Sequence, residues 1–253
     1  MSSNIASLIL GRMQSEGFPG KNLHLVLGRP LAYYPIRVAI DSVGPIHTYL
    51  STDDPRLKRL ATNMMINVID RPAELCTKEA LGEDAFVHGY NYISKRTGIE
   101  FLVLMFCNAP TVTVGIIEEG IRILRDNPNY DSAVTVSRYN MWSPGRARLI
   151  GEDGLLYPFV PFESFGDPAA LNCDRDSQGD VWFADMGASI VRPRCIENIK
   201  DGLLPQRWMG RNIFPLKQEG GLDVDYEWQI PMAEHWLRKN GHADAAYRPS
   251  NSR

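Results

Sequence analysis

The sequence has no excess of either charge and no long apolar run. It carries 27 Lys and Arg against 30 Asp and Glu in 253 residues, a formal net charge of -3, which excludes a general attraction to nucleic acid or to an anionic membrane. Apolar stretches such as 101–107 fall well short of the roughly 20 residues that span a bilayer. The N-terminus also lacks the charged region and apolar core of a signal peptide. We therefore expect a cytoplasmic protein that does not bind a membrane.

Cysteine is scarce and scattered. The four cysteines form no Cys-x-x-Cys pair: Cys76, Cys107, Cys173 and Cys195. This spacing indicates neither a zinc site nor a disulfide framework. Buried, reduced thiols are the expectation that remains.

The sequence instead alternates short apolar runs with amphipathic stretches. The expected strands are 5–10, 46–51, 67–70, 101–106, 132–137, 181–191 and 213–216. The expected helices are 30–42, one that starts at Pro55, 77–95, 114–125, 195–201 and 226–239. This order predicts an α/β fold with one open, mostly parallel sheet flanked by helices. The length fits a single domain over residues 1–253 that contains a small insertion.

The loop 11–22, which follows the first predicted strand, has the clearest chemical pattern. A loop at the carboxyl end of a parallel strand lies where open α/β sheets bind ligands. Gly17 and Gly20 allow backbone N–H groups to turn inward. Two cations and two neutral donors project from the loop: Arg12 and Lys21, with Ser15 and Asn22. The pattern predicts an anion cradle; the alternative is a glycine-containing surface loop with incidental cations. No Lys-Ser or Lys-Thr pair closes a Walker motif, and the spacing of a dinucleotide fingerprint is absent.

Four blocks in order carry a resemblance to a known family. They are Arg12-x-x-Ser15-x-x-x-Pro19-Gly20-Lys21-Asn22, Leu27-Gly28-Arg29-Pro30-Leu31, Ser51-Thr52-Asp53-Asp54 and Arg71-Pro72-Ala73-Glu74-Leu75. In these blocks the sequence resembles the cytidylyltransferases that make CMP-sialic acid and CMP-Kdo. The resemblance implies their Rossmann-like fold, of the nucleotide-diphospho-sugar transferase type. The first block departs from the family: Arg-Gly-Gly-Ser-Lys is Arg12-Met13-Gln14-Ser15-Glu16 here, so an acid replaces a cation and Lys21 carries more of the phosphate contacts.

The resemblance also assigns side chains to the nucleotide. Six are implied: Arg12, Ser15, Lys21, Asn22, Arg71 and Asn108. Of these, Lys21 and Arg12 bind the triphosphate and act in catalysis. Because Pro72 biases Arg71 towards extended backbone, its guanidinium is expected to leave the strand end; a surface salt bridge to Glu74 is the alternative.

Two further positions have a simpler or a changed role. Asp53 and Asp54 are expected to cap the helix that starts at Pro55 rather than to act as catalytic carboxylates. When the sequence is aligned on Pro110, the glutamine of the resembling family becomes Phe106, which implies a changed acceptor pocket.

Residues 141–165 differ from the rest of the chain in their pattern of short strands and turns. Turns separate two short predicted strands, 147–150 and 155–160, which form a hairpin outside the main sheet. The exposed apolar content of this hairpin predicts a covering partner. The resembling family dimerises through an inserted element here, which implies a homodimer and an insertion at about 140–180.

The polar segment 172–180 has two interpretations. It is either a solvated loop or, by the resemblance, a flap that brings Arg175 and Gln178 to the carboxylate and hydroxyls of a sugar acid.

Asp223-x-Asp225 is a candidate metal site. In extended backbone, residues two apart project to the same side, so both carboxylates can reach one hard cation. Mg²⁺ needs only one or two carboxylates because water and phosphate oxygens complete its shell. Capping of the last helix is the alternative. The resembling family has a metal-binding Asp-x-Asp in the same order before a similar helix, which implies Mg²⁺ on Asp223 and Asp225.

The resemblance implies an enzyme of carbohydrate biosynthesis, such as that of lipopolysaccharide. It would transfer CMP from CTP to a keto-sugar acid and release pyrophosphate, a reaction that depends on positioning and charge neutralisation. No histidine presents itself as a general base. Two other functions stay open: a nucleotidyltransferase for a sugar 1-phosphate or a phosphonate, and a catalytically weak regulatory protein, which Glu16 suggests. The main hypothesis requires loop 11–22 and the aspartate pair to converge on one triphosphate.

Overall fold

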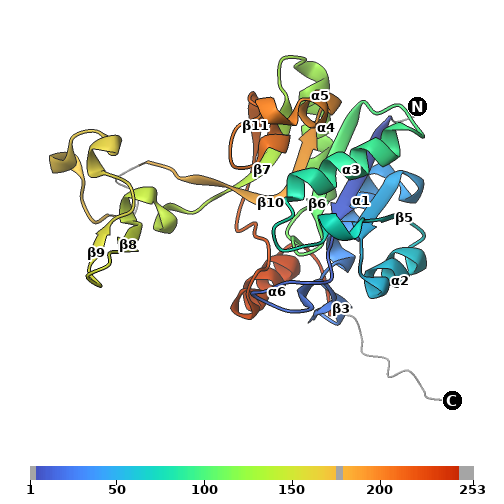
Figure 1. Cartoon of the computed structure of the whole chain (residues 1–253), viewed down its shortest axis with the longest axis horizontal. Coiled ribbons are helices and arrows are strands. Elements are labelled where there is room, and N and C mark those ends of the chain that lie inside the picture. Colours follow the sequence, from blue (N-terminus) through green and yellow to red (C-terminus); the bar gives the residue numbers. More distant parts are fainter. Residues whose placement is uncertain (1–3, 175–178, 245–253) are drawn as a thin grey trace.

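The computed structural model describes residues 4–174 and 179–244. Its body is built on a seven-stranded sheet of order β11-β7-β10-β6-β1-β4-β5 (Figure 1). These strands are β1 (Ile5–Leu10), β4 (Thr48–Thr52), β5 (Asn67–Asp70), β6 (Phe101–Phe106), β7 (Ser132–Arg138), β10 (Trp182–Val191) and β11 (Ile213–Gln218). β10 runs antiparallel to β6 and β7, and the other pairs are parallel. The predicted open, mostly parallel sheet is confirmed.

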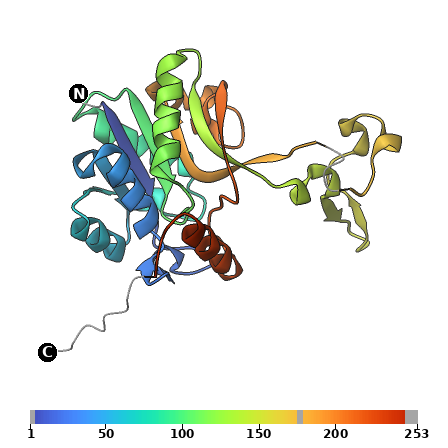
Figure 2. The same cartoon turned by 180° about the vertical axis from the view of Figure 1, so that it is seen from behind.

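Different helices cover the two faces of the sheet. The helices are α1 (Tyr33–Val43), α2 (Pro55–Asn63), α3 (Gly82–Ser94), α4 (Val114–Asp126), α5 (Pro193–Glu197) and α6 (Ile230–Lys239). Successive strand residues point to opposite faces. Ile9 of β1 therefore belongs to a buried cluster with Ile36 of α1 and Ile117 of α4, whereas Leu8 packs in a second cluster with Phe86 of α3. Figure 1 is seen from the α3 side and Figure 2 from the side of α1 and α4.

A third buried cluster joins the beginning of the chain to its end. It packs the small hairpin of β2 (Leu25–Val26) and β3 (Arg29–Pro30) against α6, which both views draw beside β3. Its buried members are Val26, Leu27, Leu31, Tyr34, Leu222, Val224, Ile230, Ala233, Trp236 and Leu237. Because burial of apolar surface contributes about 25 cal/mol per Å², this cluster fixes the residues after loop 11–22 beside those after β11.

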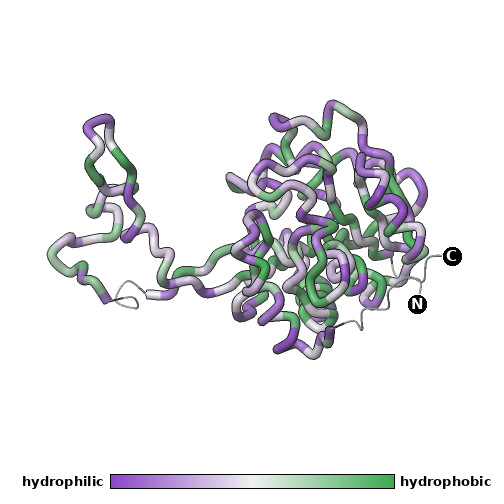
Figure 3. Tube along the Cα trace, turned by 90° about the horizontal axis from the view of Figure 1, so that it is seen from below, coloured by the Kyte–Doolittle hydropathy of each residue, from purple (hydrophilic) through white to green (hydrophobic). Residues whose placement is uncertain are grey.

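An arm leaves the body between β7 and β10. Its described residues are 139–174 and 179–181, and Figure 3 shows it extending well away from the body. The arm contains a separate antiparallel pair, β8 (Arg148–Ile150) and β9 (Leu156–Pro158), which confirms the hairpin predicted outside the main sheet. Large apolar side chains are exposed on it, among them Ile150, Leu156 and Phe159.

Helix starts differ from the prediction where no capping side chain marks them. α3 begins at Gly82 rather than at Thr77, because Leu81 before it is extended and offers no side-chain cap. α1 begins at Tyr33 rather than at Pro30, because Pro30 pairs with Leu25 in the small hairpin. In the described residues, no helix combines the length and the apolar content needed to cross a membrane.

Three other boundaries also differ. The strand predicted over 46–51 begins at Thr48, after a 3-10 helix over Pro45–His47. The helix predicted over 195–201 is α5 followed by a 3-10 helix, Ile199–Asp201. The helix predicted over 226–239 likewise begins with a 3-10 turn, Glu227–Gln229, before α6.

All four cysteines are free thiols. Cys107 and Cys195 are buried, as expected, and burial raises the pKa of Cys107 to about 12. The expectation is wrong for Cys173, which is exposed, because it lies on the arm rather than in the body.

Candidate active site

The candidate site lies at the edge of the sheet where several strands end. The parallel strands β1, β4, β5 and β6 end there, at Leu10, Thr52, Asp70 and Phe106. β11 runs in the same direction, because β10 is antiparallel to β6 and β7, and β11 is parallel to β7. The segment 219–225 after β11 therefore leaves the same edge as loop 11–22. This is the edge at which open α/β sheets bind ligands.

Loop 11–22 is attached to the end of β4 by hydrogen bonds. The backbone N–H of Gly11 donates to the carbonyl oxygen of Ser51 at 3.2 Å, and that of Met13 donates to Asp53 Oδ1 at 2.9 Å. Asn22 Nδ2 closes the loop by donating to the backbone carbonyl oxygen of Arg12 at 3.2 Å. Asp53 therefore holds the loop, and the prediction that it caps a helix is wrong.

Asp54 alone caps α2. Its Oδ1 accepts a hydrogen bond from the backbone N–H of Arg56 at 2.8 Å. The cap interpretation is confirmed for this residue.

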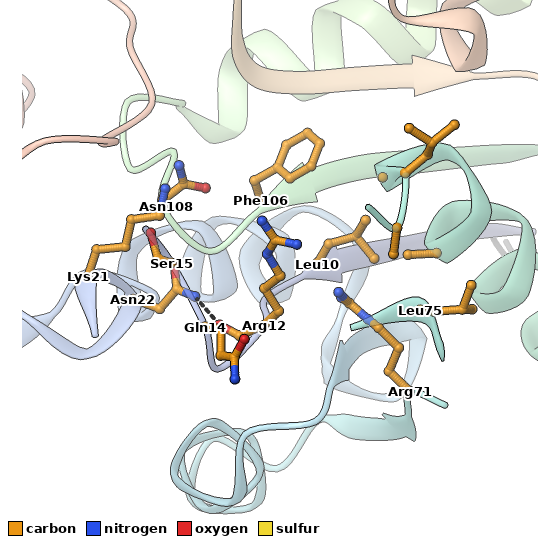
Figure 4. A pocket seen from close by; sticks show the side chains of 14 residues that line it. Leu10, Arg12, Gln14, Ser15, Lys21, Asn22, Arg71, Leu75, Phe106 and Asn108 are labelled. Atoms are coloured by element: carbon orange, nitrogen blue, oxygen red, sulfur yellow. Dashed lines mark hydrogen bonds between the residues drawn. The ribbon is translucent and has the colours of Figure 1, made fainter. Parts of the chain in front are cut away.

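A cavity of about 240 Å³ opens beside loop 11–22. Its lining includes all six predicted nucleotide contacts: Arg12, Ser15, Lys21, Asn22, Arg71 and Asn108. Figure 4 shows Arg12 at the centre, with Lys21 and Asn108 to one side and Arg71 to the other. Much of the remaining wall is apolar: Leu10, Leu75, Ala80, Leu81, Ala85 and Phe106. A cavity with a cationic side and an apolar side suits a nucleotide, although contact with one stays a prediction.

Arg71 is held rigidly at the cavity wall. Its Nη2 donates to the carbonyl oxygen of Ser51 at 2.6 Å and its Nε to Ser51 Oγ at 3.2 Å. The residue is only 9% exposed, and this burial lowers the pKa of the guanidinium. The arginine therefore bonds to β4 rather than to Glu74, the partner in the alternative interpretation.

The departures in loop 11–22 are compensated by the segment 77–81. Glu16 pairs with Lys78 at 2.8 Å on the surface, and Glu16 is not among the side chains that line the cavity. Arg12 Nη1 donates to the carbonyl oxygen of Thr77 at 2.7 Å. The acid that replaces a cation is thus neutralised at the rim, outside the cavity.

Phe106 forms a rigid wall of the cavity at the end of β6. Its ring packs edge-on against Phe86, with centroids 5.3 Å apart, and against Trp208 at 6.2 Å. A fixed aromatic side chain presents an apolar surface where the resembling family has an amide. The change in the acceptor pocket stays a prediction.

Asp223 and Asp225 converge on one amide. Asn108 Nδ2 lies 3.5 Å from Asp223 Oδ2 and 3.4 Å from Asp225 Oδ1, and it donates to the carbonyl oxygen of Val224 at 3.1 Å. Asp225 also forms an ion pair with Lys21. The two carboxylates therefore face the cationic side of the cavity.

The charge at this point fits a divalent cation. Burial, and next the negative charge of Asp225, raise the pKa of Asp223 to about 6. The two ionised carboxylates together carry more negative charge than Lys21, the ion-pair partner of Asp225, neutralises. Within the described residues, no cluster of three or more His, Cys, Asp or Glu side chains is placed to hold a metal. Two carboxylates suit Mg²⁺, which takes its other ligands from water and phosphate.

The N-terminal loop and the aspartate segment are in direct contact. A Cβ added to Gly17 would lie 2.7 Å from the carbonyl oxygen of Asp225 and 3.2 Å from the ring of Tyr226. Only glycine permits this approach. The two segments that the sequence-based hypothesis brings together are therefore neighbours, and their convergence on a triphosphate stays a prediction.

Some residues of the site were missed and some lie outside the described residues. The segment 77–81 was predicted as helix, so the contacts of Thr77 and Lys78 with loop 11–22 were not foreseen. The signal in the sequence is the unusual acid Glu16, which calls for a nearby cation but does not say which one. Arg175 and Gln178, predicted to bind the sugar acid, lie outside the described residues.

Comparison with known protein families and curated proteins gives consistent results. A family model described as "Cytidylyltransferase" matches residues 6–139. The chain is 22% identical over 244 residues to N-acylneuraminate cytidylyltransferase A of Danio rerio, which covers 95% of this chain and 52% of that protein. It is 26% identical over 140 residues to N-acylneuraminate cytidylyltransferase of Escherichia coli, which covers 55% and 33%. The chain spans about half, or less, of the length of these relatives.

Solved structures show the same fold. A CMP:2-keto-3-deoxy-manno-octonic acid synthetase complexed with CTP has a TM-score of 0.65 at 16% identity, over 94% of this chain and 100% of that one. A 4-diphosphocytidyl-2C-methyl-D-erythritol synthase from Anaerococcus prevotii has a TM-score of 0.58 at 13% identity, over 94% and 97%.

Proposed function

The chain belongs to the cytidylyltransferase family, and on this premise we propose that it transfers CMP from CTP to a keto-sugar acid of the sialic acid or Kdo class. The anomeric hydroxyl oxygen of the acid forms a bond to the α-phosphorus, the bond from that phosphorus to the β-phosphate oxygen breaks, and pyrophosphate leaves with its electron pair. The hydroxyl proton is released. The names of the relatives support this acceptor class.

The observation that carries the proposal is the contact between the cation-lined cavity and the aspartate pair, because Lys21 and Asn108 line the cavity and both bond to Asp225. Lys21 and Arg12 bind the triphosphate, whose charge must be neutralised as the bond to the leaving group breaks. Asn108 lies between this cationic side and the aspartates, where it orients the α-phosphate. Arg71 is proposed to bind the nucleotide without further ordering, since its contacts to β4 already hold the guanidinium at the cavity wall.

Asp223 and Asp225 are proposed to hold Mg²⁺. When bound, the metal neutralises triphosphate charge and polarises the reacting groups. Ser15 and Asn22 are proposed to donate to phosphate oxygens or to the base, since both side chains line the cavity. Arg175 and Gln178 are proposed to bind the carboxylate and hydroxyls of the acceptor.

The arm is proposed to form a homodimer. The arm extends away from the body (Figure 3), and its apolar side chains Ile150, Leu156 and Phe159 are exposed, so no surface within the described residues covers them. A second copy of the chain supplies such a surface, which agrees with the insertion proposed at about 140–180.

Pyrophosphate release tests the proposed reaction. The enzyme is supplied with Mg²⁺ and each of the four nucleoside triphosphates, then with two acceptor panels: sugar acids (sialic, legionaminic and pseudaminic acids, Kdo) and sugar 1-phosphates or phosphonates. Turnover with CTP and a sugar acid is expected. Turnover only with a sugar phosphate would replace this acceptor class, and CTP binding without any turnover would indicate a regulatory protein. The pairing of Glu16 with Lys78 removes the reason for the regulatory alternative.

A further inference from the structure

Among the described residues, one buried carboxylate that forms no ion pair lies against Gly221, two positions before Asp223. Asp185 is 5% exposed and belongs to β10. Its Oδ2 accepts hydrogen bonds from Ser137 Oγ at 2.6 Å and from Gln218 Nε2 at 2.8 Å. Its Oδ1 accepts one from the backbone N–H of Gly187 at 3.2 Å. Burial of a carboxylate costs folding free energy even when it accepts such hydrogen bonds, which points to a functional role for Asp185.

The backbone is distorted to place this carboxylate. In the register of β10 and β7, Ala184 pairs with Val136 and Ser189 with Val134, so that residues 185–188 oppose a single residue. Met186 within this bulge has a φ of 62°, a left-handed conformation that a side chain disfavours. Bulges of this kind re-aim side chains. Here the bulge turns Asp185 towards the segment after β11.

Ser137 connects Asp185 to that segment. The hydroxyl has one proton, which it donates to Asp185, so a lone pair is left to accept from the backbone N–H of Gly221 at 2.9 Å. Ser137 is fully buried, and no water competes for its proton. Asp185 therefore determines which way the hydroxyl points, and the hydroxyl holds Gly221.

The glycine at position 221 is required by the same contact. A Cβ built on Gly221 would overlap the carboxylate of Asp185 and the amide of Gln218. Gln218 also donates to the carbonyl oxygen of Thr111 at 3.0 Å, and Thr111 Oγ1 accepts from the backbone N–H of Leu222 at 2.7 Å. The residues immediately before Asp223 are thus held at consecutive backbone groups, Gly221 by Ser137 of β7 and Leu222 by Thr111 of the loop after β6.

We infer that Asp185, acting through Ser137 and Gly221, is a positioning residue that sets the separation and direction of the Asp223 and Asp225 carboxylates. The inference depends on the proposed metal role of that pair. Groups that orient metal ligands change metal affinity by about 10–100-fold when they are removed. Asp185 lies too deep to touch substrate, and its effect is confined to the segment that it anchors.

The test compares Mn²⁺ binding by electron paramagnetic resonance in three variants of the full chain. Asp185→Asn turns one acceptor oxygen into a donor, which meets either the N–H of Gly187 or the donors Ser137 and Gln218 and disturbs the network in both orientations. Ser137→Ala removes the link to Gly221. Each is expected to raise the Kd for Mn²⁺ about tenfold. Ser132→Ala is the matched control, because Ser132 lies on the same strand, is equally buried, and donates to the carbonyl oxygen of Met209 at 2.5 Å rather than to this segment.

Two further readouts separate positioning from loss of fold. The melting temperature is expected to fall in both serine variants, since Ser137→Ala loses two buried hydrogen bonds and Ser132→Ala loses one. The Mg²⁺ concentration for half-maximal activity is expected to rise only in Ser137→Ala and Asp185→Asn, with the KM for CTP at saturating Mg²⁺ unchanged. If Asp185→Asn does not fold, Ser137→Ala against Ser132→Ala decides the question.

Unchanged Mn²⁺ affinity in the folded variants would overturn the inference and leave the proposed reaction standing. Weakened Mn²⁺ binding in the two variants, together with a wild type that binds Mn²⁺ but turns over no acceptor, would support the positioning role and overturn the proposed reaction. Absence of Mn²⁺ binding in the wild type would overturn both.

Discussion

Lys21 and Asp225, which lie 204 positions apart in the chain, form an ion pair at the wall of the cavity. The lysine side chain is 13% exposed and the aspartate side chain 54% exposed. Each residue is proposed to bind a different part of the reacting system, the triphosphate and Mg²⁺. We therefore expect the pair to exchange partners on binding, with the metal taking the carboxylate and the phosphates taking the ammonium group.

Replacement of Lys21 by Met is expected to lower kcat/KM for CTP by about 10²–10³-fold, because one preorganised charge is lost where charge develops. Steady-state pyrophosphate release at saturating Mg²⁺ measures this loss. The flexible hydrocarbon stem of methionine keeps most of the packing of lysine, so the fold is expected to be retained.

Lys78→Met is the matched control for that loss. Lys78 is exposed and pairs with Glu16 at the rim, so its removal is expected to change kcat/KM by less than about threefold, as for other surface pairs. Equal losses in the two variants would show that general positive charge, rather than the placement of Lys21, binds the triphosphate.

Asp225→Ala is expected to abolish measurable turnover and leave the fold intact. The side chain is mostly exposed and contributes little to packing, whereas loss of a metal ligand removes charge neutralisation at the reacting phosphate. Circular dichroism and pyrophosphate release measure the two effects. Asp41→Ala, which removes a similarly exposed acid paired with Arg37, is expected to retain full activity. Near-normal activity in Asp225→Ala would contradict the metal role and favour the alternative that the aspartate pair caps the last helix.

Asp223→Asn is expected to stabilise the protein at neutral pH when metal is removed by EDTA. The pKa of Asp223 is raised from 3.8 to about 6 in the folded state, first by burial and then by Asp225. A raised pKa favours folding below about pH 4, and this contribution is lost as the pH rises through about 6. The variant never ionises, so its advantage over the wild type is expected to grow to on the order of 2 kcal/mol above pH 7 and to vanish near pH 4. Urea unfolding at these two pH values measures the difference.

The same variant is expected to lose the stabilisation that added Mn²⁺ gives the wild type. Binding of the cation requires the ionised carboxylate, so Mn²⁺ affinity of the wild type should fall as the pH drops through about 6. An equal advantage of Asp223→Asn at both pH values would show that better packing, and not the removed charge, accounts for its stability.

Sequence patterns predicted the strands because burial on both faces leaves a continuous apolar run. Phe101–Phe106, which is such a run, was obtained with its observed ends, and so was the less buried edge strand Asn67–Asp70. The start of α3 was predicted too early. Thr77 and Lys78 have ordinary helical propensity, but they lie before the helix, where they contact loop 11–22. Such a contact depends on the tertiary fold and has no local periodicity.

The residues of the site likewise include some that the sequence predicts and one that it does not. Lys21 and Asp225 could be nominated from spacing and family order, because charged side chains near strand ends carry a recognisable pattern. Asp185 could not, because nothing in its neighbours marks a strand position as buried and irregular. Its role follows from a bulge and from contacts with residues up to 48 positions away, such as Ser137, that only coordinates supply.

Leu156→Glu combined with Phe159→Glu is expected to convert a dimer into a monomer. Both side chains are more than 60% exposed on an arm that leaves the body, so they contribute little to the folding of one chain and much to a covering partner. Two charges buried in an apolar interface carry a desolvation cost that a homodimer does not recover. Light scattering after gel filtration measures the mass.

Ile46→Glu is the control for the arm variant, since Ile46 is 71% exposed but lies on the body, just before β4. It is expected to leave the mass of the wild type unchanged. A monomeric wild type at micromolar concentration, or a doubly substituted protein that still has the mass of two chains, would contradict dimerisation through the arm. Ile46 is a single exposed apolar side chain on the body, whereas Leu156 and Phe159 belong to a group of exposed apolar side chains on the arm. A fall in mass in the arm variant alone would therefore assign the dimer contact to that group.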